Sequence, residues 1–147
     1  MQDEGGRFSD CLVNLGRCET GSVAGRRRIP VEQGRAALRA WAASDDRSTV
    51  DRTTLATAVR HTVADLGDAA PGRSVEVRVP PFAAVQCVEG PVHTRGTPPA
   101  VVETDAQTWL ELVVGDLAWA EAVASGRVRV SGQRTDLSAH LPLTALP

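Results

Sequence analysis

Apolar residues in the first half of the chain repeat with the period of an α-helix. One face of residues 30–43 collects Val31, Leu38, Trp41 and Ala42. A second stripe recurs at intervals of three and four residues and consists of Leu55, Val59, Val63 and Leu66. Such spacing places the side chains on one side of a helix. The pattern predicts two amphipathic helices. The second begins near Ser48 and Asp51, which have the spacing of a capping box, and ends at Gly67. His61 lies on the polar side of this second helix and is expected to be exposed.

The period changes to two from residue 74 onward. Val75, Val77 and Val79 alternate with charged residues, which is typical of a half-buried strand. Residues 83–89 predict a second strand with Val85 and Cys87 on one face. Shorter runs at residues 100–103 and 128–131 predict two more strands.

Helical signals return between and after the last two strands. Thr104 or Asp105 can cap a helix over residues 106–114, which Gly115 ends. A short helix is expected over 117–124, and a final helix is expected to begin at Thr135. The order of elements predicts an α+β fold in which helices pack on one antiparallel sheet of about four to five strands. Residues 29–147 would form this single domain.

Residues 1–28 differ from the rest of the chain. They are rich in glycine, lack a sustained apolar period and end in three consecutive arginines. Such a segment buries too little apolar surface to offset chain entropy, so we expect a disordered or loosely docked tail. A start-site extension is the alternative, with translation beginning near Val23, because GTG often serves as a start codon in GC-rich genomes. The composition fits such a genome, for example an actinobacterial one, since all 16 basic residues are arginine and tyrosine is absent.

Charge, apolar run length and cysteine number indicate which partners and which compartment to expect. The net charge is −2 with both signs interspersed, so the sequence predicts no nucleic-acid partner. Apolar runs are far shorter than the roughly 18 residues of a membrane span, and the acidic N-terminus lacks the features of a signal peptide. Three cysteines, an odd number, favour reduced thiols in the cytoplasm. Cys11 and Cys18 lack further ligands nearby, so no metal site is expected.

The second half of the chain carries a recognisable succession of motifs. It reads Thr-Asp-x-x-Thr-Trp-Leu-x-Leu from Thr104, then Gly-Asp-Leu-x-Trp from Gly115, then Val-x-Val-x-Gly from Val128. This stretch resembles the C-terminal half of the sterol carrier protein family. The segments 75–82, 85–91 and 93–98 look like the actinobacterial branch of that family, and the resemblance covers roughly residues 29–147.

The resemblance implies one layer of sheet covered by helices, with an apolar tunnel between them for acyl chains or sterols. It implies no covalent chemistry. We expect no cofactor. The family's sheet has about five strands, whereas four are found in this sequence. Residues that we expect either to line such a cavity or to fill the core are Val85, Cys87, Trp109, Val113, Trp119, Val123, Leu137 and Leu141. The chain is therefore interpreted as a non-catalytic domain that sequesters or presents an apolar ligand.

Two other interpretations remain open at this point. The polar residues Glu89, His93, Arg95 and Glu103 surround a loop rich in glycine and proline, and they form either an anion site or a surface loop with an internal ion pair. As a separate alternative, the domain could be an accessory module that binds a protein and no small ligand. A thiol-dependent enzyme with Cys87 as nucleophile and His93 as base is least favoured, because apolar neighbours raise a thiol's pKa.

Overall fold

The computed structural model describes residues 29–91 and 100–143. The predicted tail at residues 1–28 and the candidates His93 and Arg95 lie outside these ranges. Four strands, four α-helices and two 3-10 turns occur within the described residues. In chain order they are α1 (Val31–Ala42), η1 (Arg47–Thr49), α2 (Arg52–Ala69), β1 (Val75–Val79), β2 (Ala83–Cys87), β3 (Ala100–Thr104), α3 (Ala106–Val114), α4 (Trp119–Ala124), β4 (Val128–Ser131) and η2 (Ser138–His140).

The described strands form one mixed sheet in the order β2-β1-β3-β4. β1 pairs with β2 antiparallel and β3 pairs with β4 antiparallel, but the central pair β1 and β3 is parallel. The α+β class and the four strands are confirmed, whereas the expectation of a wholly antiparallel sheet is wrong. The chain leaves β2 opposite Val75, at the start of β1, and β3 begins at that same end on the other side of β1. β3 therefore runs in the same direction as β1.

The two faces of the sheet have different surroundings. Val75, Val77 and Val79 point to the face that the helices cover, and all three are buried. The side chains between them, Glu76 and Arg78, are partly exposed on the other face and form an ion pair at 2.9 Å. The alternation predicted for β1 is confirmed, and the hydrophobic core lies between one face of the sheet and the helices.

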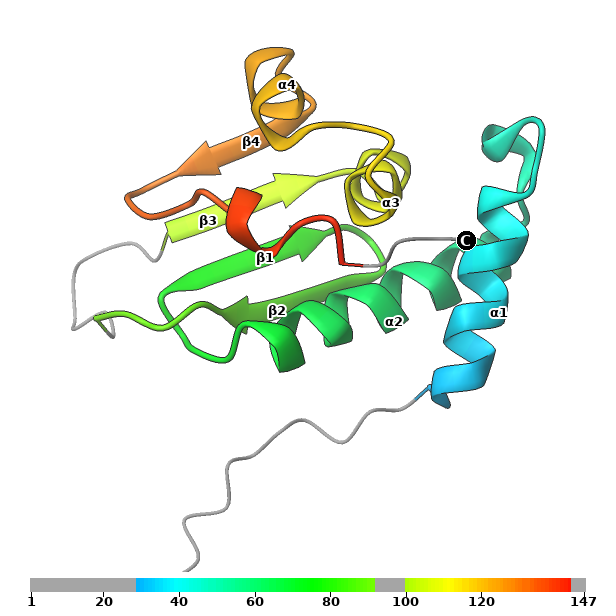
Figure 1. Ribbon diagram of the computed structural model, residues 1–147, viewed down its shortest axis with the longest axis horizontal. Coiled ribbons are helices and arrows are strands. Elements are labelled where there is room, and N and C mark those ends of the chain that lie inside the picture. Colours follow the sequence, from blue (N-terminus) through cyan, green and yellow to red (C-terminus); the bar gives the residue numbers. More distant parts are fainter. Residues whose placement is uncertain (1–28, 92–99, 144–147) are drawn as a thin grey trace, which may run out of the picture.

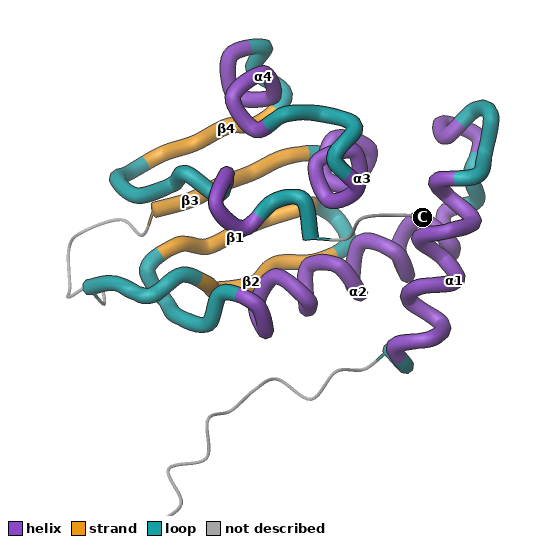
Figure 2. Tube along the Cα trace, in the orientation of Figure 1, coloured by secondary structure: helices purple, strands orange, loops and turns teal. Residues whose placement is uncertain are grey.

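Each helix packs over a different part of the covered face of the sheet or against a neighbouring helix. α2 runs along β2, α3 contacts α2, and α4 lies beside β4 (Figure 1). The C-terminal segment after β4 returns as a loop across the same face, between α4 and α2 (Figure 2). The final helix expected from Thr135 is reduced to the 3-10 turn η2, although Leu137 is fully buried as expected. Pro142 lies two residues after the turn and supplies no N–H for a longer helix.

α2 differs in two respects from its prediction. Asp51 caps the helix by accepting from the N–H groups of Thr53 and Thr54, so the helix begins after the capping-box serine. Gly67 does not end it, because α2 continues to Ala69. A Cβ atom at Gly67 would lie 2.8 Å from a methyl group of Val85. The missing side chain therefore allows α2 and β2 to approach each other.

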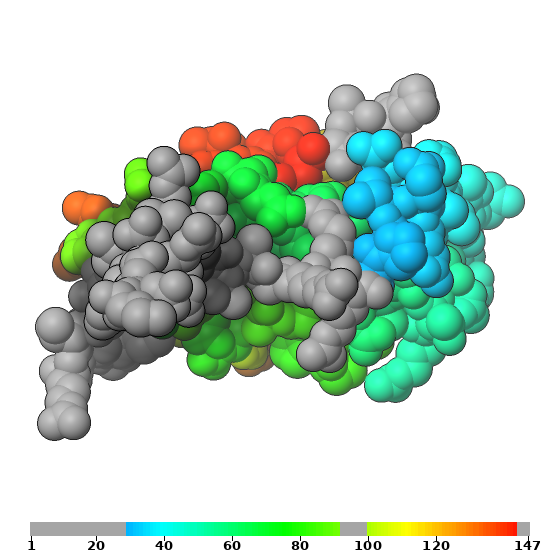
Figure 3. All heavy atoms as spheres, turned by 90° about the horizontal axis from the view of Figure 1, so that it is seen from below, coloured from blue at the N-terminus to red at the C-terminus, as the bar shows by residue number. Residues whose placement is uncertain are grey.

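α1 covers a side of α2 that the sequence predicts to face solvent. Figure 3 shows α1 against the first residues of α2 at one end of the molecule. His61, expected to be exposed, is only 3% exposed because Gly34 of α1 packs directly on its ring. Its Nε2 atom lies 3.3 Å from the carboxylate of Asp65. The prediction for His61 is wrong because α2 contacts α1 as well as the sheet.

Replacing Gly34 by alanine tests this close approach. The new Cβ atom would overlap Cγ of the buried His61 ring. So severe an overlap lies at the upper end of the about 1–3 kcal/mol that overpacking costs, and the gain in helix propensity is about 1 kcal/mol, so we expect a net loss of about 2 kcal/mol in urea unfolding. Gln33→Ala, exposed on the same helix, should change stability by less than about 0.5 kcal/mol. Equal stability of the two variants would show that α1 does not pack on His61.

Candidate functional site

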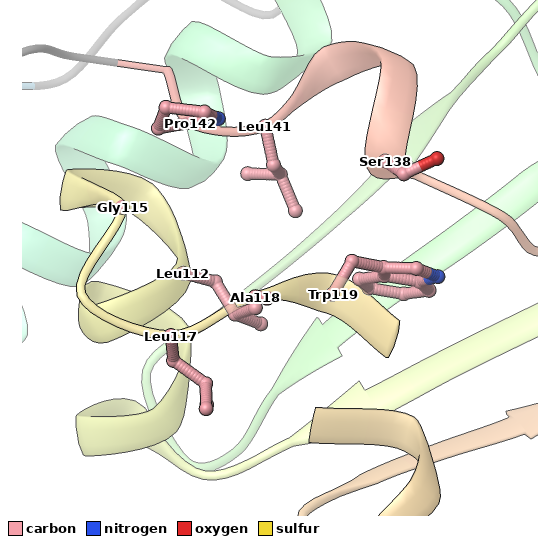
Figure 4. A pocket seen from close by; sticks show the side chains of 8 residues that line it. All are labelled: Leu112, Gly115, Leu117, Ala118, Trp119, Ser138, Leu141 and Pro142. Carbon is pink, nitrogen blue, oxygen red and sulfur yellow. The ribbon is translucent and has the colours of Figure 1, made fainter. Parts of the chain in front are cut away.

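An open cavity of about 320 Å³ lies between α3, the connection from α3 to α4, and the C-terminal segment. One wall consists of Leu112 from α3 and of Gly115, Leu117 and Ala118 from the connection, and Trp119 begins α4. The opposite wall consists of Ser138, Leu141 and Pro142 (Figure 4). Most of the lining atoms are apolar, and the side chains bear no charge, so the site suits a hydrophobic guest.

The connection between α3 and α4 owes its shape to Gly115. This residue ends α3 with φ of +87°, a left-handed conformation that glycine adopts without steric cost. The carbonyl of Glu111 then accepts from the N–H groups of residues 115, 116 and 117 at 3.1, 2.9 and 3.3 Å. The chain thereby turns sharply, and Leu117 and Ala118 are placed at the cavity.

A side-chain network fixes the same connection from outside. Asp116 forms an ion pair with Arg47 at 2.7 Å, and the Arg47 guanidinium lies over the ring of Trp41 at 4.3 Å. The indole N–H of Trp41 donates to Gln107 of α3 at 2.7 Å, and the Gln107 amide donates to the Arg47 carbonyl at 2.9 Å. One wall of the cavity is therefore tied to the segment between α1 and α2.

The C-terminal wall is held at two points. Leu137 is fully buried in the core, and the N–H of Leu143 donates to the carbonyl of Val113 at 3.0 Å. Leu141 and Pro142 lie between these anchors and face α3 across the cavity (Figure 4). Both walls thus consist of chain that is fixed by contacts outside the cavity.

The predicted apolar candidates separate into two groups. Trp119 and Leu141 line the cavity. The other six belong to the core or pack against it: Cys87, Trp109, Val113 and Leu137 are buried, and Val85 and Val123 are partly buried. Sequence reasoning did not single out Leu112, Gly115, Leu117, Ala118, Ser138 and Pro142 as lining residues. Four of these lie in or beside the Trp-Leu-x-Leu and Gly-Asp-Leu-x-Trp motifs, which were the available signal.

The structure does not bring the two described members of the polar group together. Glu89 follows the end of β2 and is exposed, close to the end of the sheet marked by Val75 and Cys87. Glu103 of β3 pairs with Arg78 of β1. Arg78 lies three residues beyond Val75, which is about 10 Å at the rise of a strand. The two carboxylates therefore do not form one site.

The Cys87 thiol occupies a dry position. It is 0% exposed, and burial raises its pKa from 9.0 to about 11. At neutral pH the sulfur is protonated, and the thiolate is the form that attacks electrophiles. Its proposed base, His93, lies outside the described residues. The surroundings of Cys87 are those of a small core side chain.

The described residues contain neither a candidate membrane span nor a candidate metal cluster. No helix in the described part of the chain is long and apolar enough to cross a membrane. Across residues 29–91 and 100–143, no three histidine, cysteine or acidic side chains are grouped so that they could hold a metal ion.

Comparison with known protein families gives a match. A family model described as "Bacterial SCP ortholog" matches residues 51–143, which is more than half of the chain. The matched segment includes α2, the whole sheet, α3, α4 and every residue that lines the cavity. No curated protein matches the chain.

Proposed function

The chain belongs to the family of bacterial SCP orthologues, and we propose that it binds an apolar small molecule in the cavity between α3 and the C-terminal segment, without catalysing a reaction. The single observation that carries this proposal is the cavity itself, formed by uncharged and mostly apolar groups within the matched segment. Ligand pockets have volumes of about 300–1,000 Å³, and a cavity of about 320 Å³ lies at the lower end of that range.

Binding there would draw its free energy from the removal of apolar surface from water. Each Å² contributes about 25 cal/mol, against which stands the loss of translational and rotational freedom of the ligand. The ordered walls reduce the further cost of fixing side chains. A buried, protonated Cys87 supports a role without covalent chemistry.

Filling the cavity should abolish binding without unfolding the domain. Ala118 lines the cavity and is exposed, so phenylalanine at this position adds a ring to the space without disturbing a buried contact. We expect the neutral fluorophore N-phenyl-1-naphthylamine to bind the native chain with increased emission, and Ala118→Phe to weaken binding at least tenfold, or about 1.4 kcal/mol. A fluorescence titration measures both.

Ala120→Phe provides the matched control. Ala120 is exposed in α4 and does not line the cavity, so this variant should bind the fluorophore as the native chain does. Absence of binding to the native chain, or equal binding by the two variants, would refute the proposal. Circular dichroism confirms that both variants are folded.

A further inference from the structure

The C-terminal wall of the cavity carries a carboxylate at its edge. Asp136 lies two residues before the lining residue Ser138 and accepts a hydrogen bond from the Ser138 N–H at 2.8 Å. The hydroxyl of Ser138 donates to the same carboxylate. These two hydrogen bonds hold the pKa of the Asp136 carboxyl below its ordinary value, so the group is ionised at neutral pH. A negative charge is therefore fixed within hydrogen-bonding distance of the cavity lining.

This carboxylate has no cationic partner in the described part of the chain. Asp136 takes part in none of the ion pairs there. The Nη1 atom of Arg134, two residues before it, lies beside Gly90, 3.3 Å from where a Cβ atom of that glycine would stand. Arg47 is paired with Asp116 at 2.7 Å. A carboxylate has about four lone-pair sites, so those of Asp136 that remain can face a positively charged group.

An aromatic ring lies at the same end of the cavity. The close-up places the indole of Trp119 and the side chain of Ser138 at one end, away from Gly115 (Figure 4). Trp119 is only partly buried. Among the described residues, arginines lie over the rings of Trp41 and Phe82 but not over Trp119. The face of an indole attracts cations more strongly than other aromatic rings do, and quaternary ammonium groups are recognised in this way.

We propose that the cavity takes an amphiphile with a cationic head of the alkylammonium type. The head lies between the Asp136 carboxylate and the ring of Trp119, and the alkyl chain lies against the apolar wall that includes Leu112 and Leu141. This inference rests on the proposed function, because it names the class of molecule that the cavity binds. It sets no limit on the length of the chain, since the cavity is open and a longer chain can extend beyond it.

Calorimetric titration of the native chain with three matched amphiphiles tests the charge of the head. Decyltrimethylammonium, 1-decanol and decanoate are compared at pH 7, below the concentrations at which they form micelles. We expect the cation to bind more tightly than 1-decanol by at least about threefold, the combined effect of the ring and an exposed carboxylate. Decanoate should bind more weakly than 1-decanol. Equal binding of all three, or tighter binding of decanoate, overturns the inference.

Two variants test the groups that hold the head. Asp136→Asn keeps an oxygen that can accept from the Ser138 N–H but removes the charge. It should weaken decyltrimethylammonium about two- to fivefold and leave 1-decanol unchanged, whereas Asp45→Asn, the same change at an exposed carboxylate that does not belong to the lining, should affect neither. Trp119→Leu should lower the ratio of the two affinities about two- to fivefold, because both ligands lose the same apolar contact. A preference for the cation that survives either substitution overturns the inference.

Ala118→Phe shows whether the cation binds in the cavity. This variant should lose decyltrimethylammonium together with N-phenyl-1-naphthylamine, since the added ring occupies the same space. Retained binding of the cation would place it elsewhere and overturn the inference. If the native chain binds the fluorophore and 1-decanol but does not prefer the cation, the assignment of the head fails and the proposed function stands. If it binds neither the fluorophore nor any of the three amphiphiles, the proposed function itself fails.

Discussion

Replacement of Trp109 by alanine is expected to lower the free energy of unfolding by about 3–5 kcal/mol, the usual cost of removing a large aromatic side chain from a core. Trp109 is 0% exposed. Its indole N–H donates to the hydroxyl of Thr62 at 2.9 Å, and that hydroxyl donates in turn to the carbonyl of Ala58 at 2.9 Å. The side chain therefore joins α3 to α2 through both packing and a satisfied polar chain.

Urea unfolding followed by circular dichroism measures the loss in the free energy of unfolding. The circular dichroism signal is suitable because it depends little on how many tryptophans the chain contains. Trp109→Phe should lie between the native chain and the alanine variant, since it keeps a ring and leaves the Thr62 hydroxyl bonded to Ala58. Trp119→Ala is the matched control. Trp119 is only partly buried, so its loss should cost clearly less. Equal destabilisation by the two alanine variants would mean that α3 is not anchored through Trp109.

Native Cys87 should react with thiol reagents at neutral pH at least a hundredfold more slowly than a free thiol. A pKa of about 11, against an ordinary 9.0, lowers the thiolate fraction about a hundredfold at neutral pH. Complete burial slows access further. The measurement uses a chain in which Cys11 and Cys18 are replaced by serine, so that only Cys87 reports. Labelling in urea, where the thiol is exposed, should proceed at the ordinary rate.

The same thiol makes a pH-dependent contribution with a defined sign. Burial raises the pKa of Cys87, so the folded state favours the protonated form. Below pH 9 the thiol is protonated in both states. As the pH rises from about 9 to about 11, the unfolded state loses the proton first and stability falls. Cys87→Ala should remove this decline. Fast labelling of native Cys87 would contradict the dry environment and revive a thiol-dependent activity.

The period of apolar residues determined the elements of this protein well. Val75, Val77 and Val79 alternate and form β1, and the stripe through Val59 and Val63 forms α2. These predictions succeed because they depend on neighbours in sequence, which share one side of a helix or strand. His61 shows the limit of this reasoning, since a second contact surface of α2 meets α1, and the period of α2 does not reveal it.

For the cavity, too, the sequence predicted part of the result and the tertiary structure decided the rest. The sequence identified Trp119 and Leu141 as candidates but could not distinguish them from Trp109 and Leu137, which fill the core. All four are large apolar residues, and burial alone favours each of them equally. The difference arises from where the C-terminal segment crosses α3, and that crossing depends on a hydrogen bond between Leu143 and Val113, 30 residues apart.

The amino-acid sequence by itself thus determined the α+β class, the bounds of most elements and the family to which the domain belongs. Tertiary structure alone decided the parallel pairing of β1 with β3, the burial of His61 and the place of the cavity. The physical reason is that helix and strand periods are set by covalent geometry over a few residues. Strand order and cavities depend on contacts between segments that lie far apart in the chain. The same pattern of apolar residues is compatible with several such arrangements.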